Sequence, residues 1–100
     1  MIYTLIKVTI MTIEFTVPAD QWIQITTAGE EKGSLYCQDE DSSIALTEAG
    51  SIPTSDISDT PLGNIIKQFE SKGFFGLGTG NFLYARALNK PTRITVSIAD

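Results

Sequence analysis

The stretch FLYARALNKPTRITVSI, which covers Phe82–Ile98, contains the two clearest strand patterns of the chain. Residues 92–98 alternate between polar and β-branched apolar side chains, which is the period-two pattern of a strand with one buried face. Residues 82–88 are apolar at nearly every position, and Arg86 is the one charged residue among them. Asn89-Lys90-Pro91 separates the two runs and is typical of a turn. We therefore predict a hairpin made of these two strands.

Shorter runs with the same alternation occupy most of the remaining chain. Residues 11–17 place Met11, Ile13, Phe15 and Val17 on one face and polar side chains on the other. Further strand patterns cover residues 22–27, 34–38 and 43–47, whereas residues 65–70 fit either a strand or a helical turn. Turn signals recur at intervals of about 8 to 12 residues, as in all-β domains. We predict an all-β fold, either an antiparallel β-sandwich or a jelly-roll-like barrel of seven to eight short strands.

The chain has 100 residues, enough for a single domain with one core. We expect residues 11–100 to form this domain and residues 1–10 to form an N-terminal arm or added strand. The boundary lies where the alternation changes phase, between Ile10 and Met11. Such a change indicates a bulge, a tight turn or a strand that leaves one sheet for another. Met1 and Met11 both remain possible natural starts, and the arm has the character of neither a signal peptide nor a membrane span.

The composition argues against several functional classes. A net charge of −5 argues against nucleic-acid binding, which depends on lysine and arginine neutralising phosphates. The chain has no histidine, so histidine-based catalysis and histidine-ligated metals are excluded. Cys37 is the single cysteine, and we expect it to be a small buried residue. We predict no enzymatic activity, no membrane partner, no metal and no cofactor.

Three other patterns resemble functional motifs without matching their spacing. The glycine loop 76–80 lacks the spacing of a phosphate-binding loop and is followed by a strand pattern instead of a helix, so we expect a loop with positive φ angles. The acidic run 39–41 does not fit a calcium-binding loop, and we expect a solvated turn. Asp56 and Asp59 lie in the long irregular stretch 50–64, but nothing in the sequence sets the separation that carboxylate catalysis requires.

Apolar residues in unusual positions point to an interaction surface. Residues 82–88 present Phe82, Tyr84 and Leu88 to one side and further apolar residues to the other, so both faces of this strand should be buried. The second face is covered either by loops of the same chain or by another chain, with Arg86 as a paired interface charge. The interface candidates are Trp22, Phe74, Phe75, Phe82, Tyr84 and Arg86.

Several segments together resemble a recurrent type of small structural protein from tailed-bacteriophage virions. They are WIQITTAG (22–29), GSLY (33–36), IPT (52–54), GTGNFLYARAL (78–88) and RITV (93–96). The resemblance extends over roughly residues 12–98, apart from residues 65–72. It implies a β-sandwich or jelly-roll-like protein, commonly a homotrimer, that decorates or cements the head or belongs to a virion appendage. No catalytic residues accompany this resemblance.

The expected function is that of a non-enzymatic head decoration or cement subunit that stabilises the capsid through subunit interfaces. Its partners would be other copies of itself and the major capsid protein or other virion proteins. Its location would be the virion, assembled in the host cytoplasm. The alternative is a carbohydrate- or receptor-binding module at a phage fibre or tail tip, with Trp22, Phe74, Phe75 and Tyr84 stacking on the ligand.

Overall fold

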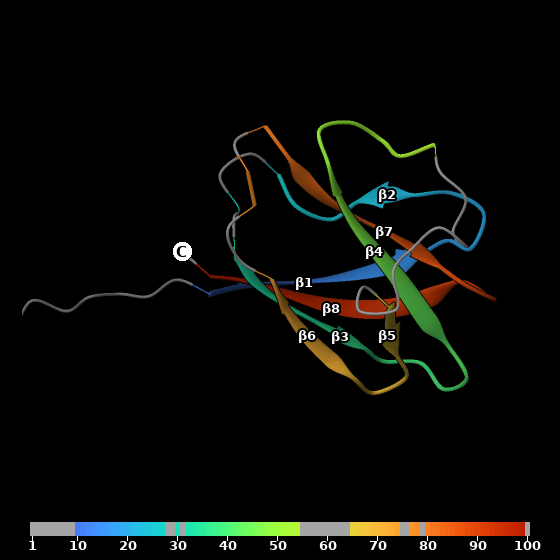
Figure 1. Ribbon diagram of the computed structural model, residues 1–100. Coiled ribbons are helices and arrows are strands. Elements are labelled where there is room, and N and C mark those ends of the chain that lie inside the picture. The colour runs from blue at the N-terminus through green and yellow to red at the C-terminus, as the bar shows by residue number, and fades with distance from the viewer. Residues whose placement is uncertain are drawn as a thin grey trace, which may run out of the picture.

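The computed structural model describes residues 10–27, 30, 32–54, 65–74, 77–78 and 80–99. These residues form eight strands and no helix, arranged in two antiparallel sheets of four (Figure 1). The strands are β1 (Ile10–Val17), β2 (Ile23–Gln24), β3 (Gly33–Cys37), β4 (Ser43–Ala49), β5 (Ile65–Lys67), β6 (Ser71–Phe74), β7 (Phe82–Ala87) and β8 (Thr92–Ala99). The all-β antiparallel sandwich predicted from the alternation is confirmed.

The order of the strands identifies the arrangement as a jelly roll. One sheet has the order β1-β8-β3-β6 and the other β2-β7-β4-β5. The first four strands therefore pair with the last four in reverse order: β1 with β8, β2 with β7, β3 with β6 and β4 with β5. Additional pairing of β3 with β8 and of β4 with β7 completes each sheet. This nested pairing across two packed sheets is the jelly-roll form of the β-sandwich.

The predicted hairpin between residues 82–88 and 92–98 is wrong. β7 lies between β2 and β4 in one sheet, and β8 lies between β1 and β3 in the other. At the end of β7, the N–H groups of Ala87 and Leu88 donate to the carbonyls of Pro18 and Ser43. The chain then crosses to the other sheet before Thr92. Alternation alone does not distinguish strands that pair side by side from strands that face each other across a core.

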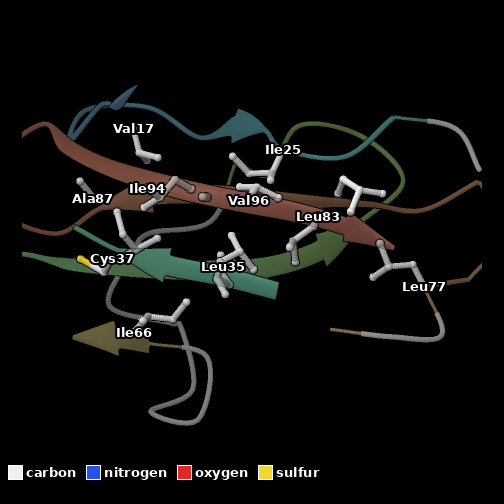
Figure 2. Packing of buried hydrophobic residues seen from close by; sticks show 14 residues of the cluster. Val17, Ile25, Leu35, Cys37, Ile66, Leu77, Leu83, Ala87, Ile94 and Val96 are labelled. Carbon is white, nitrogen blue, oxygen red and sulfur yellow. The ribbon is translucent and has the colours of Figure 1, made fainter. Parts of the chain in front are cut away.

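The core lies between the two sheets. β7 contributes Leu83, Ala85 and Ala87, and β8 contributes Ile94, Val96 and Ile98, all of them buried. Figure 2 shows these side chains with others of the cluster, including Leu35 from β3 and Ile66 from the edge strand β5. Each fully buried valine, leucine or isoleucine side chain of this cluster stabilises the fold by about 1.5–3 kcal/mol.

β1 is an edge strand with the two faces expected from the sequence. Val17 is buried and Ile13 and Phe15 are half-buried, whereas Thr12 and Thr16 are exposed. Pairing with β8 proceeds residue for residue along the whole strand. The change of phase between Ile10 and Met11 is therefore neither a bulge nor a tight turn, and Ile10 belongs to β1.

β2 is shorter than the strand predicted over residues 22–27. Ile25 still donates its N–H to the carbonyl of Leu83 at 2.8 Å. The next bond is different, because the N–H of Leu83 donates to the Thr26 hydroxyl oxygen at 3.0 Å rather than to a backbone carbonyl. A side-chain hydroxyl thus replaces the backbone carbonyl as the acceptor, and the regular backbone pairing of β2 with β7 ends at Gln24.

The remaining differences concern the segment around Phe69. Of the strand and the helical turn that fit residues 65–70, the structure has a strand, β5, which covers residues 65–67. β6 follows after a turn in which Phe69 has a φ of 58°. Nothing in the alternation predicts β6, because its four residues include one glycine and one lysine.

Candidate functional site

The outer face of the β2-β7-β4-β5 sheet carries a second apolar cluster. Tyr84 and Ala45 are 2% and 0% exposed, and Trp22 packs beside them at 6%. Ala49, Phe82 and Leu88 surround this cluster and are half-buried. The other face of β7 lies in the main core, so β7 is apolar on both sides, as predicted. Within a single chain, both sides are already covered.

A hollow of about 260 Å³ adjoins this cluster, and we refer to it as the Trp22–Arg86 hollow. Three parts of the chain build it: the segment before β2, the segment after β4, and β7. Its lining residues are Asp20, Gln21, Trp22, Ile52, Pro53, Thr54 and Arg86. Two of the residues predicted for an interface, Trp22 and Arg86, are therefore brought together.

Arg86 is held in a fixed orientation at this hollow. Its side chain is half-buried, and its Nε donates to the carbonyl of Ala19 at 3.0 Å. Among the residues that the structure describes, no carboxylate forms an ion pair with it. A guanidinium oriented in this way presents its remaining N–H groups for a planar acceptor such as a carboxylate.

Ile52 gives the hollow an apolar rim. Its side chain is 64% exposed, the largest value among the large hydrophobic residues that the structure describes as exposed. Pro53 follows it and also lines the hollow. Arginine and tryptophan are among the residue types that are enriched at the centres of protein interfaces. The hollow thus combines the Arg86 guanidinium and the Asp20 carboxylate with apolar surface at Trp22 and Ile52.

A second hollow, of about 250 Å³, lies at one end of the sandwich between β4 and β6. We refer to it as the Phe74–Glu48 hollow. Its lining is apolar at Leu46, Phe74, Leu77 and Leu83 and polar at Thr47, Glu48 and Lys72. Phe74 is half-buried and packs against the core. The hollow thus combines an aromatic side chain with groups that form hydrogen bonds.

Glu48 fixes the loop beside this second hollow. Its Oε2 accepts hydrogen bonds from the side chain of Asn81 at 2.8 Å and from the N–H of Gly78 at 3.1 Å. These two bonds, that from Asn81 first, lower the pKa of the Glu48 carboxyl. Gly80 in the same loop has the positive φ expected of it, at 82°, whereas Gly78 does not.

The six predicted interface residues occupy different places. Trp22 and Arg86 line the Trp22–Arg86 hollow, and Tyr84 and Phe82 lie in the adjoining apolar cluster. Phe74 is on a separate surface, in the Phe74–Glu48 hollow. Phe75 lies outside the described residues, as do Asp56 and Asp59.

Sequence reasoning missed Ile52, Glu48 and Lys72. Glu48 had a signal, because it shares the inward phase of Ile44 and Leu46 on β4 and a charged residue there is unexpected. Ile52 lies in an irregular stretch rich in serine, threonine and proline, so no periodicity marks it. Lys72 lies opposite the buried Leu35 in the pairing of β3 with β6, which only the register reveals.

The acidic turn and the cysteine play structural roles. Asp39 forms an ion pair with Arg93, and no group of three metal-ligating side chains occurs in the described part of the chain. Cys37 is fully buried in the core, as predicted, and burial raises the pKa of its thiol.

Comparison with known proteins gives no relative: no protein-family model, curated protein or solved structure matches the chain. In the residues that the structure covers, no helix is long and apolar enough to cross a membrane.

Proposed function

We propose that this chain is a non-enzymatic structural protein of a bacteriophage virion, a head decoration or cement subunit. Its work is binding: it stabilises the capsid by holding the major capsid protein or other virion proteins through subunit interfaces. It acts as a homo-oligomer, with three copies as the resemblance to small virion proteins favours. Assembly takes place in the host cytoplasm, and the virion is its final location.

The Trp22–Arg86 hollow is the observation that carries this proposal. Arg86, oriented by its bond to Ala19, meets Trp22 and the exposed Ile52 there, and arginine and tryptophan are residue types that often dominate binding energy in protein interfaces. The jelly roll adds weaker support, because viral capsid proteins use it, but lectins and cupins use it as well.

The proposal is tested by binding to empty capsid shells of the encoding phage. Arg86→Gln and Ile52→Asp should each weaken binding to the shells by about tenfold or more, since each removes a central contact. Phe69→Asp is the matched control: Phe69 is 50% exposed but does not line either hollow, so its replacement should leave binding unchanged. Absence of shell binding by the unmodified chain would refute the proposal.

A second candidate function is a carbohydrate- or receptor-binding module at a fibre or tail tip. The Phe74–Glu48 hollow favours it, because an aromatic ring beside a carboxylate and an ammonium group suits a sugar. On a glycan array, binding that is lost in a Phe74→Ala, Phe75→Ala double variant would support this function. Lys72→Met serves as a second variant that leaves the packing of Phe74 in place. Binding that survives both changes would exclude this loop as the site.

A further inference from the structure

Among the sheet edges formed by the described residues, the outer edge of β1, to which none of these residues pairs, differs from the others. The two sheets end in β1, β6, β2 and β5, which have eight, four, two and three residues. Short edge strands are one way in which proteins prevent unwanted strand pairing, as are lysine and proline on the edge. β1 is long and contains neither residue type. Its open edge is therefore suited to receive another strand.

The hydrogen bonds around β8 show which amides of β1 face this open edge. The carbonyl of Arg93 accepts from Gln38 and its N–H donates to Asp39, so the backbone of Arg93 points toward β3. In antiparallel pairs successive residues point alternately to the two sides, so Ile94 and Val96 point toward β1. Their partners are Phe15 and Ile13.

The residues between those partners must point the other way. Thr12, Glu14 and Thr16 therefore direct their N–H and C=O groups to the open edge, where no strand of the described residues pairs with them. The side chains of Ile13 and Phe15 are only half-buried at the same edge. An added strand would satisfy the amides and cover these two side chains.

Residues 2–9 have the composition of such a strand. They read IYTLIKVT and consist mainly of β-branched and aromatic residues, with no glycine, proline, asparagine or aspartate. They directly precede β1 and equal it in length, at eight residues. Lys7 is their one charge, and Glu14 is the one charge of β1.

We infer that residues 2–9 of a second copy of this chain add as an antiparallel strand to the free edge of β1. Setting Lys7 opposite Glu14 defines the register, and it places Val8 opposite Ile13 and Ile6 opposite Phe15. The apolar face of the arm then extends the core face of β1, and the opposite charges lie side by side on the outer face. The partner is thus chosen by backbone hydrogen bonds, apolar burial and one charge pair.

A second copy fits this edge better than the arm of the same chain. In the same register, an arm folding back on its own β1 would need a two-residue turn at Ile10-Met11. Both residues are paired in line with β8, and such turns require positive φ angles that a β-branched isoleucine resists. Addition of the arm to a second copy also explains the change of phase between Ile10 and Met11. The arm then buries its apolar face in the sheet of the neighbouring copy, whereas β1 buries its apolar face in the sheet of its own chain.

Donation of the arm from each copy to the next is a head-to-tail contact, the type that forms a ring when the rotation between copies closes. The inference rests on the proposed function only in requiring that copies assemble. It concerns a surface separate from the Trp22–Arg86 hollow.

The register is tested with cysteines in the full chain. Thr9→Cys combined with Thr12→Cys places two thiols opposite each other between copies, at a separation that a disulfide spans. After mild oxidation, non-reducing gels should show covalent dimers and trimers, because Cys37 is buried and does not compete. Thr4→Cys with Thr12→Cys is the control, and it should give none, since the two positions lie five residues out of register. A disulfide confined to the single chain, or no linkage in a variant that still assembles, would overturn the inference.

A second pair of variants tests the edge without added thiols. Thr12→Pro removes one N–H from the open edge while leaving the bonds to β8 intact, and Thr12→Val keeps that N–H. In sedimentation equilibrium, Thr12→Pro should weaken assembly about tenfold or more, and Thr12→Val should assemble like the unmodified chain. Equal assembly of the two variants would contradict the edge contact but not the proposed function, whereas an unmodified chain that remains a monomer would contradict the assembly that both require.

Discussion

Arg93 donates three hydrogen bonds to the carboxylate of Asp39, which lies in the turn that follows β3. The backbone N–H of Arg93 donates to Oδ2 at 2.7 Å, and its Nε and Nη2 donate to Oδ1 at 3.0 and 2.9 Å. These bonds, the backbone one first, hold the pKa of the Asp39 carboxyl below its usual value of 3.8. The ionised carboxylate thus ties the β3–β4 turn to the start of β8.

This contact predicts a dependence of stability on pH. Because the folded pKa of Asp39 is depressed, its contribution is complete above pH 3.8 and is lost as the pH falls through the folded pKa. Asp39→Asn should therefore lower the free energy of unfolding at pH 6, and the difference between variant and unmodified chain should shrink toward pH 2. Urea unfolding at the two pH values measures this. A difference that stays constant with pH would contradict the assignment.

The close approach of β3 to β8 predicts different effects on stability when each of two glycines is replaced by alanine. A Cβ at Gly33 would collide with the carbonyl oxygen of Ser97, whereas one at Gly73 would meet nothing closer than 3.7 Å. Gly33→Ala should therefore destabilise the fold by about 1–3 kcal/mol, as overpacking does. Gly73→Ala should remain within about 0.5 kcal/mol of the unmodified chain. Thermal unfolding of the two variants provides the comparison, and equal melting temperatures would show that β3 and β8 lie farther apart.

The hydroxyl of Thr26 predicts a difference between two similar substitutions. It is fully buried and accepts the hydrogen bond of the Leu83 N–H. Thr26→Val leaves that N–H without an acceptor and should cost about 1–3 kcal/mol. Thr26→Ser keeps the oxygen and should cost only about 0.8 kcal/mol for the missing methyl group. If the serine variant is the less stable of the two by urea unfolding, the hydroxyl does not hold β2 to β7.

The burial of Cys37 predicts that its thiol is protected. Desolvation raises its pKa, and the side chain has no exposed surface in the folded chain. Iodoacetamide at pH 8 should therefore modify the folded chain far more slowly than the chain in urea. Mass spectrometry of the modified protein measures both rates. Rapid modification of the folded chain would mean that the core opens readily around β3.

The sequence allowed the fold class and the buried faces of β1 and β8 to be predicted, because each rests on local alternation. The partner of each strand was not accessible in the same way. β7 and β8 have the sequence pattern of a hairpin, yet they lie in different sheets. Each strand has a row of apolar side chains, and the two rows pack in the core between the sheets. Distance along the chain gave no sign of the pairing of β1 with β8.

The residues of the candidate site could also be predicted only in part. Trp22 and Arg86 were recognisable as interface residue types, but their meeting depends on the pairing of β2 with β7. Ile52 reaches the same hollow from an irregular segment, where no periodicity marks an exposed apolar residue. Residue types could therefore be predicted, whereas their grouping on one surface depends on the jelly-roll connections.

The most direct test of a head decoration role is an image of purified phage particles by electron cryomicroscopy, compared with particles lacking this chain. We expect density of jelly-roll size on the outer surface of the head, in groups of three copies that contact the major capsid protein. Identical heads in the two samples, with the missing density at a tail tip or nowhere on the particle, would contradict this role.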